Sequence, residues 1–375
     1  MAARVILAIK DDRKNYSPKR MLRFGAAVID VDQAMPEHSA SRRFRSLFPF
    51  LLLPIVASSL GLAQPALADT HPGQAALVSE VARDTGKSPA ALNALLDQAK
   101  MQQGILDAIS RPAEAKPWSA YRPIFLTDKR IADGVAFYRE HRELLERIGK
   151  QYGVAPQYIV AILGVETFYG RVTGKYKVLD ALVTLGFYYP PRATYFRQQL
   201  KTLLELPDNH LAGPLDTLTG SYAGAQGWGQ FMPDSIRDYA VDAEGDGRID
   251  LQNSLPDILA SVANYFAKHG WVDGGPVAAR AQPDGAAKPL GDWQAKPQWP
   301  LEQLEAWGYA PFQHLNPGEP TSLLMLDGLS GPEHWFTFNN FYVITRYNRS
   351  PMYAMAVDQL ALAIMDGVRS ADRVQ

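Results

Sequence analysis

The chain contains no cysteine among its 375 residues. Disulfide bonds are therefore excluded, and an exported chain of this kind has to be stabilised by its core or by a metal ion. Attachment of an N-terminal lipid through a cysteine is not expected either. The sequence therefore predicts a protein without a lipid anchor.

A surplus of basic residues is also missing. The formal net charge is −1, from 38 Lys and Arg residues against 39 Asp and Glu residues. Nucleic-acid binding calls for a basic face, so this class of function is not indicated. With 47% hydrophobic and 21% charged residues, the chain is otherwise an ordinary globular protein, long enough for more than one core.

Long apolar runs are rare. The most apolar stretch, residues 47–62, is too short and too interrupted by proline for a membrane span. Arginines at 42, 43 and 45 precede it, and a small-x-small cleavage site ends at Ala68. This pattern predicts a secretory signal peptide, and we expect translation to begin at Met35, close to the basic cluster.

Cleavage after Ala68 changes the charge balance. Removal of residues 1–68 leaves 28 basic against 34 acidic residues, a net charge of −6. We therefore expect a soluble periplasmic protein whose mature chain starts near Asp69 and which has no nucleic-acid partner.

The residues that are present centre on the stretch 156–170. Pro156 suits the first position of a helix and Gly170 suits the residue just past its end. Ile159, Ile162 and Glu166 follow one another at helical spacing, so they share one face, which should be buried. The stretch therefore predicts an apolar helix with one carboxylate on its buried face.

A carboxylate in that position is costly. Loss of solvent and the negative end of the helix dipole both disfavour the ionised form, so both raise the pKa of Glu166. An acid that stays protonated near neutral pH is what cleavage of a glycosidic bond needs. A Glu paired with an arginine in the core is the alternative, and this helix alone does not decide between them.

Residues 220–233 carry four glycines among aromatic and amide side chains. This composition predicts an irregular loop that a polymer can approach closely. A packed turn with Trp228 in the core is the alternative.

Residues 242–253 match an EF-hand calcium loop, with acids at positions one, three, five and nine and a glycine at position six. The match is incomplete because position three is Glu and position twelve is Asn253, although Asp257 could supply a late ligand. A turn of Asp and Gly without a metal is the alternative. The predicted structural calcium ligands are Asp242, Glu244, Asp246, Arg248 and Asp257.

The remaining spacing predicts mostly helices. We expect a helical hairpin over residues 74–109, a long helix over 127–148, a helix ending near Leu206 and one capped by Ser254. Beyond Gly270 we expect a short helix at 301–307, strands at 322–326, 335–338 and 341–347, and a final helix at 352–368.

Four motifs in a fixed order resemble the lytic murein transglycosylases of the MltB type, glycoside hydrolase family 103. The resemblance covers residues 74–368, more than three quarters of the chain, and the order is far more specific than any one motif. The motifs are Gly164-Val165-Glu166 with Gly170; Gly220-Ser221 with Gln230-Phe231-Met232-Pro233; Asn264-Tyr265-Phe266 with His269 and Trp271; and Thr345 with Tyr347-Asn348 and Tyr353.

The resemblance implies an α+β, mainly helical fold. Its lysozyme-like catalytic core would have a helical N-terminal region and a small antiparallel β insertion before the C-terminal helix. The expected divisions are 1–68 for the extension and signal peptide, 69–117 for a helical region and linker, 118–271 for the catalytic core with the EF-hand-like loop at 242–257, 272–347 for the β subdomain, and 348–375 for the C-terminal helix.

The resemblance also implies the reaction. A single Glu, here Glu166, would first protonate the leaving oxygen of the bond between N-acetylmuramic acid and N-acetylglucosamine. As a base it would then take the proton of the muramoyl O6, whose attack gives a 1,6-anhydro product. No second acid stands in these motifs, unlike the two-carboxylate scheme of most glycosidases.

Further site residues follow from the family pattern, and no cofactor is needed for the chemistry. Amides pair with N-acetyl groups, and aromatic rings offer flat apolar faces with polar tips. The residues around Glu166 or on the sugar amides would be Ser221, Gln230, Tyr347, Asn348 and Tyr353, and those lining the glycan and stem-peptide groove Tyr121, Arg192, Tyr195, Phe231 and Tyr265.

Two features depart from the family. Pro191 and Arg192 stand where paired arginines are frequent, which weakens the expected recognition of the peptide or lactyl group, and the lipid of the named type is ruled out by Asp69. We expect a monomer that binds peptidoglycan strands, with cell-wall synthesis proteins as candidate partners. The alternative functions are a hydrolytic muramidase, a non-catalytic glycan-binding scaffold, and a calcium-responsive interaction protein, which would usually show paired EF-hands.

Overall fold

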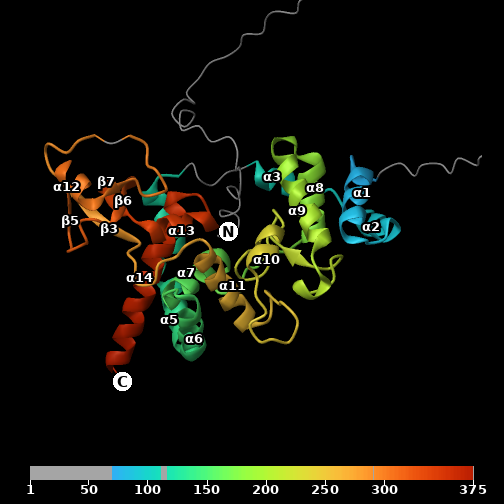
Figure 1. The fold of residues 1–375 in the computed structure, drawn as a ribbon, viewed down its shortest axis with the longest axis horizontal. Helices are drawn as coiled ribbons and strands as arrows, with labels where there is room; N and C mark the ends of the chain where they lie inside the picture. Colours follow the sequence, from blue (N-terminus) through green and yellow to red (C-terminus); the bar gives the residue numbers. More distant parts are fainter. Residues whose placement is uncertain (1–69, 111–115, 290, 375) are drawn as a thin grey trace, which may run out of the picture. The chain divides into compact units, whose positions relative to one another are not determined.

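The computed structural model describes residues 70–110, 116–289 and 291–374. Helices dominate these residues, and one small antiparallel sheet precedes the last two helices (Figure 1). The predicted α+β, mainly helical fold is therefore confirmed. The predicted signal peptide and its cleavage site lie outside the described residues.

The N-terminal described part holds three helices where one hairpin was expected: α1 (Gln74–Thr85), α2 (Pro89–Leu96) and α3 (Gln103–Ile109). Ser88 caps α2 by accepting a hydrogen bond from the Ala91 amide, with Pro89 in the first position. Lys100 and Gln102, between α2 and α3, donate hydrogen bonds to Asp180. These bonds attach the connection between α2 and α3 to α8 (Val178–Tyr188), the helix that contains Asp180.

The expected long helix over 127–148 is interrupted. After α4 (Trp118–Phe125), the chain forms α5 (Asp128–Glu140) and α6 (Arg142–Tyr152), with Thr127 capping α5 as predicted. His141 between them is not helical, with φ −110° and ψ 21°. The apolar spacing carries across this break because both helices turn an apolar side toward the same core, so the spacing alone did not reveal it.

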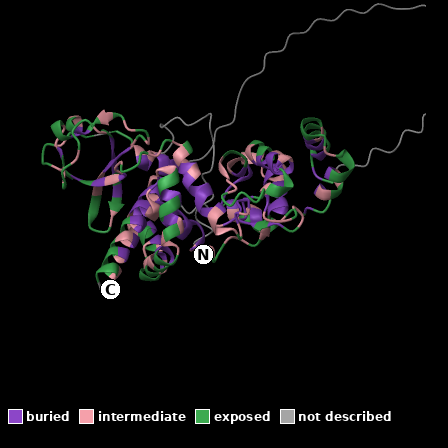
Figure 2. Ribbon diagram, turned by 60° about the horizontal axis from the view of Figure 1, so that its bottom comes forward, coloured by how far each residue is buried: buried purple, intermediate pink, exposed green. Residues whose placement is uncertain are grey.

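The centre of the core is α7 (Pro156–Thr167), in which every residue from Tyr158 to Thr167 is buried. The C-terminal helix α14 (Pro351–Val374) packs along α7 and α5, and α11 (Leu255–Lys268) packs on α6 and α7. Figure 2 shows that α14 is buried along one side and exposed toward its end. Among the described residues, no helix combines the length and the apolar character that crossing a membrane requires.

A second group of helices follows α7. The segment after it forms α8 (Val178–Tyr188), a short 3-10 turn η3 (Pro190–Arg192) and α9 (Ala193–Glu205), followed by the 3-10 turn η4 (Asp208–His210). The helix α9 packs on α8, on α10 (Pro233–Tyr239) and on α1. The predicted end near Leu206 is confirmed.

Residues 220–233, which we call the substrate loop after the role that the resemblance implies, are irregular as predicted. The strands β1 (Tyr176–Lys177) and β2 (Thr219–Gly220) pair as a short antiparallel ladder that ends at the first residue of the loop. Inside the loop an isolated bridge joins Gln226 to Phe231. Ser254 caps α11 by accepting from the Asp257 amide, as expected. The loop therefore connects two well-formed parts without regular structure of its own.

The small sheet has the strand order β4-β6-β7-β3-β5 among the described residues, with all neighbours antiparallel. Its own core includes Leu301, Leu304, Phe336 and Phe338. The strands and the helix within this part are β3 (Ala278–Pro283), β4 (Trp299–Pro300), α12 (Leu301–Ala306), β5 (Tyr309–Pro311), β6 (Pro320–Gly328) and β7 (Gly331–Thr337).

One predicted strand is wrong. Residues 341–347 belong to α13 (Asn339–Tyr347), not to the sheet. Their aromatic and β-branched side chains favour a strand by propensity, but α13 packs on α14 and buries Phe341, Ile344 and Tyr347 at helical spacing. The described residues all fall in one unit by their contacts, so the expected divisions inside it stay predictions.

Candidate active site

Glu166 lies in the last turn of α7 and its residue is 2% exposed. The hydroxyl of Tyr353, in α14, donates a hydrogen bond of 2.7 Å to its Oε1. This bond joins the predicted acid to a residue 187 positions further along the chain. The predicted burial of Glu166 is confirmed.

The helix α7 ends right after Glu166 because the backbone turns left-handed. Phe168 and Tyr169 have φ values of 55° and 57°, which non-glycine residues rarely adopt, and the Tyr169 amide donates to the Leu163 carbonyl. Gly170 follows with φ 80°, and a Cβ there would come within 2.2 Å of the Trp228 ring. Such strain is typical of functional sites and is held here by packing.

Thr167 connects this helix end to the substrate loop. Its hydroxyl donates to the Trp228 carbonyl at 2.9 Å and accepts from the Gly170 amide at 3.0 Å. Thr167 was not predicted as a site residue, although its position next to Glu166 was a signal. The end of α7 and the loop are therefore held in one arrangement.

Two phenols accompany Glu166. Tyr347 is fully buried and donates to the Gly229 carbonyl at 2.5 Å. Burial, followed by the charge of Glu166, raises the pKa of Tyr347 and of Tyr353 well above the ordinary value. Both groups therefore keep their protons and act as hydrogen-bond donors.

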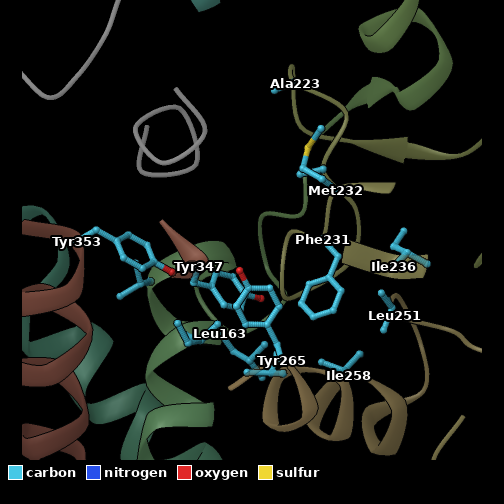
Figure 3. Packing of buried hydrophobic residues seen from close by; sticks show 14 of the residues in the cluster. Leu163, Ala223, Phe231, Met232, Ile236, Leu251, Ile258, Tyr265, Tyr347 and Tyr353 are labelled. Atoms are coloured by element: carbon cyan, nitrogen blue, oxygen red, sulfur yellow. The ribbon is translucent and has the colours of Figure 1, made fainter. Parts of the chain in front are cut away.

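The predicted aromatic residues Tyr265 and Phe231 lie beside Tyr347. The ring centroids of Tyr265 and Tyr347 are 4.7 Å apart, and that of Phe231 is 6.0 Å from each of them. Figure 3 shows the three rings together, coming from α11, α13 and the substrate loop. The Tyr265 hydroxyl donates to the Arg346 carbonyl at 2.6 Å, which joins α11 to α13.

Ser221 and Gln230 hold the substrate loop. The Ser221 hydroxyl oxygen accepts from the amides of Ala223 and Ala225. Gln230 has φ 52°, and its side-chain nitrogen donates to the carbonyls of Thr173 and Gly227. Both residues therefore shape the loop, and their contact with sugar stays a prediction.

The chain is similar to known proteins in sequence and in fold. A family model described as the Transglycosylase SLT domain matches residues 70–362. The chain belongs to this family. The resemblance found in the motifs is confirmed, and the protein is a lytic transglycosylase that acts on peptidoglycan.

Named relatives agree with this assignment. The chain is 41% identical over 304 residues to membrane-bound lytic murein transglycosylase B of Escherichia coli (strain K12), covering 78% of this chain and 83% of that one. The soluble lytic transglycosylase SltB1 from Pseudomonas aeruginosa is 47% identical with a TM-score of 0.71, over 78% of this chain and 98% of that one. The Escherichia coli lytic transglycosylase SLT35, solved in complex with calcium, is 40% identical with a TM-score of 0.72, over 82% of this chain and 95% of that one.

The remaining predicted residues of the transglycosylase divide into two groups. Asn348 is buried directly after Tyr347 and accepts from the Ser350 amide, which shapes the turn into α14, while Tyr121 is buried between Trp118 and Phe125. Tyr121 also lies close enough to Tyr353 to raise its pKa. Tyr121 therefore lies near the tyrosine that bonds Glu166, whereas the role of Asn348 on the sugar amides stays a prediction.

Arg192 and Tyr195 form a pair elsewhere, on η3 and α9. The Arg192 guanidinium lies over the ring of Tyr195 at 4.8 Å and over that of Phe196 at 5.1 Å. Tyr121 and Phe231 are each only 1% exposed, so their rings fill the core in this structure. The roles of these four residues in a glycan groove stay predictions.

The EF-hand-like loop is held by its own backbone. Asp242 accepts from the amides of Gly245 and Gly247, and Asp257 accepts from those of Ala243 and Asp250. In the described part of the chain, no three acidic or histidine side chains converge closely enough to hold a metal ion. The other predicted ligands also have partners in the loop, with Glu244 accepting from Ser254 and Asp246 from the Arg248 amide.

The donor chemistry of the loop nevertheless fits a hard cation. Burial raises the pKa of Asp257, and the nearby charges of Asp242 and Glu244 raise it further. A divalent cation would offset the repulsion among these three carboxylates. Each carboxylate oxygen also has a second lone pair with which it could bind the cation. The chemistry therefore suits calcium, whereas the side-chain positions here serve backbone amides.

The end of this loop braces the substrate loop. The Trp228 amide donates to the Leu251 carbonyl at 3.1 Å, and the Gln252 side chain donates to the Thr173 hydroxyl at 3.3 Å. A Cβ on Gly227 would lie 2.3 Å from the Leu251 carbonyl oxygen, so only glycine allows this approach. The EF-hand-like loop and the end of α7 beside Glu166 are therefore linked by the two backbone hydrogen bonds of Trp228.

Proposed function

We propose that Glu166 is the only acid and base of this transglycosylase, and that the products carry 1,6-anhydro-N-acetylmuramic acid ends. The observation that carries the proposal is the buried Glu166 carboxyl with the Tyr353 hydroxyl on its Oε1. An acid removed from water is favoured in its protonated form, which is the form that can donate to a leaving oxygen.

The chemistry balances with one carboxyl group. Glu166 gives its proton to the glycosidic oxygen as the bond from that oxygen to C1 of the muramoyl residue breaks. The resulting carboxylate takes the proton of the O6 hydroxyl while O6 forms a new bond to C1. The Tyr353 hydrogen bond stabilises the carboxylate between the two steps, because donation to the charged form favours it.

Exclusion of water supports internal attack by O6. Glu166, Tyr347 and Tyr353 are all nearly or fully buried. A water molecule positioned by Glu166 would instead give reducing ends, as in the alternative muramidase. The two outcomes differ by one water in the mass of each released fragment.

The test is product analysis of digested peptidoglycan sacculi. The wild-type protein should release fragments with anhydro ends, and Glu166→Gln should release none while keeping its melting temperature, since the amide has no acidic proton. Glu302→Gln, at an exposed acid of α12, is the matched control and should retain turnover.

Other results have distinct meanings. Turnover by Glu166→Gln would remove Glu166 from its role. Fragments heavier by one water would assign a muramidase, and binding to sacculi without fragments from the wild type would assign a scaffold.

Calcium binding is part of the proposal. Asp242, Glu244, Asp246, Asp257 and the Arg248 carbonyl would hold the ion, which would staple the loop rather than take part in the reaction. The support is the oxygen chemistry of the loop and the similarity to SLT35, which was solved with calcium.

Location and assembly complete the proposal. The protein acts in the periplasm after export, as a soluble monomer on peptidoglycan strands, with cell-wall synthesis proteins as candidate partners. One relative is named membrane-bound and another soluble, so the relatives do not agree on anchoring. The support for the soluble form is the absence of cysteine from the sequence.

A further inference from the structure

A second buried acid lies in α14, outside the site described above. Asp358 is 2% exposed, the same fraction as Glu166. The hydroxyl of Tyr158, in α7, donates a buried hydrogen bond of 2.8 Å to its Oδ1. Burial raises the pKa of Asp358 to about 7, and burial together with the Asp358 charge raises that of Tyr158.

The partner of Asp358 distinguishes it from two other buried acids. Asp180 and Asp257 both accept hydrogen bonds from backbone amides, so they close loops. Asp358 lies in the middle of a continuous helix, where the helix satisfies the backbone amides itself. Its bond to Tyr158 therefore joins two helices.

The two helices are joined twice, in a crossed arrangement. The helix α7 supplies the acid Glu166 to the tyrosine Tyr353 of α14, and α14 supplies the acid Asp358 to the tyrosine Tyr158 of α7. Glu166, near the end of α7, pairs with Tyr353 near the start of α14, and the earlier Tyr158 pairs with the later Asp358, so the helices run antiparallel along this contact.

The two hydrogen bonds between α7 and α14 restrict movements of these helices that apolar packing allows. Tyr158 and Glu166 are eight residues apart, about 12 Å along α7 at the usual helical rise. Between them, Ile162 and Leu163 are fully buried. Apolar contact resists separation of the helices but is not directional, so it allows sliding and rotation. Two directional bonds at separated points oppose both.

A polar pair in this place has a cost that packing alone would avoid. Burying a carboxyl and a hydroxyl is unfavourable unless they bond to each other, and an apolar pair of similar volume is often as stable. The pair therefore contributes geometry rather than net stability. The geometry in question is the position of α7, whose last turn carries Glu166.

We propose that Tyr158 and Asp358 are positioning residues for Glu166: their hydrogen bond fixes α7 on α14 so that the Tyr353 hydroxyl meets the Glu166 carboxyl. This inference rests on the proposed function of Glu166. Neither residue touches the substrate, and both act through the placement of the helix.

The test uses three variants and kinetics on soluble glycan strands. Tyr158→Phe should lower kcat about tenfold or more, with little change in KM, because a small misplacement of a catalytic group has effects of this size. Asp358→Leu should do the same. Asp358→Asn keeps an oxygen that accepts from Tyr158, so it should recover most of kcat.

The double variant Tyr158→Phe with Asp358→Leu separates positioning from stability. Replacing both partners by apolar groups leaves no buried group unsatisfied, so the melting temperature should return toward that of the wild type. The value of kcat should stay low because the directional bond is still missing. Weaker donation from Tyr353 should also move the loss of activity at high pH to a higher pH.

The matched control is Tyr309→Phe. Tyr309 is 5% exposed and donates to the Lys288 carbonyl at 3.0 Å, in the small sheet region with its separate core. This variant also loses a tyrosine hydroxyl and its hydrogen bond, which is partly buried, and should lower the melting temperature with kcat unchanged.

Two results would overturn the inference. One is an unchanged kcat in Tyr158→Phe, and the other is a kcat that recovers with the melting temperature in the double variant. The role of Glu166 is judged separately by Glu166→Gln. If that variant stays active while Tyr158→Phe loses kcat, the proposed function fails and the pair positions some other group of α7.

Discussion

At the scale of single residues, the site holds tyrosines whose pKa is raised by burial, so they keep their protons. Tyr347 and Tyr353 are fully buried next to a carboxyl group, and both burial and that charge keep their protons in place. In the proposed reaction the charge of Glu166 changes twice, and a phenol that stays neutral offers it a hydrogen-bond donor in every step. This donor supports the proposal that one carboxyl group serves as both acid and base.

A pH dependence of stability is predicted for Asp358. Its pKa is about 7 in the folded protein against 3.8 ordinarily. Between these values the unfolded chain binds fewer protons, so the free energy of unfolding falls as pH rises from about 4 to about 7 and levels off above. Asp358→Asn cannot ionise, so it should lack this loss, which amounts to a few kcal/mol.

Urea unfolding at about pH 5 and about pH 8 checks this prediction. The variant should gain stability relative to the wild type at the higher pH, and other titrating groups cancel in the comparison. An equal difference between the two proteins at both pH values would contradict the raised pKa.

At the scale of elements, one helix end and two loops form a connected unit. Thr167 bonds the Trp228 carbonyl, and the Trp228 amide bonds the Leu251 carbonyl at the end of the EF-hand-like loop. A change in the EF-hand-like loop can therefore reach the residue next to Glu166 through two hydrogen bonds. An ion that stabilised the EF-hand-like loop would therefore also stabilise the position of the substrate loop.

Calcium should raise the melting temperature of the wild-type protein. Binding to the folded state at a hundredfold excess over Kd stabilises it by about 3 kcal/mol. Asp257→Asn should abolish this rise, because a central carboxylate of the loop is lost. The measurement is a thermal scan with calcium and with a chelator.

Asp180→Asn is the control for the calcium effect. Asp180 is also a buried acid that accepts from a backbone amide, but it serves the connection between α2 and α3. It should keep the full rise with calcium. No rise in the wild type, or an equal rise in Asp257→Asn, would speak against the site.

At the scale of the whole molecule, the sheet is an insertion between two helices that belong to the core. The chain leaves α11, forms the sheet with its own apolar cluster, and returns through α13 and α14 to α7. The last helix, α14, thus brings Tyr353 and Asp358 into contact with α7, the helix that carries Glu166. The insertion can carry its own core because both of its ends are held by these helices.

Export is the prediction for the whole chain. The protein should be found in the periplasmic fraction with an N-terminus near Asp69, because the small residues at 66 and 68 suit cleavage by a signal peptidase. N-terminal sequencing of the purified protein and fractionation of cells check this. A terminus well upstream of Asp69, or retention in the membrane fraction, would refute it.

The sequence by itself determined what depends on neighbours along the chain. Pro156 at a helix start, Ser254 and Thr127 as caps, and the glycines of residues 220–233 each act within a few residues, so local spacing revealed them. Glu166 was found in the same way, as a single acid among apolar residues. Asp358 gave the same signal in residues 351–361 and was missed because no family motif included it.

Only the tertiary structure decided which distant groups meet. Glu166 and Tyr353 are 187 positions apart, and Tyr158 and Asp358 are 200 apart, so no periodicity within one helix relates them. Residues 341–347 form a helix because they pack on α14, against their own preference for a strand. Local spacing encodes which side of an element is buried, whereas the partner of that side is set by the packing of the whole core.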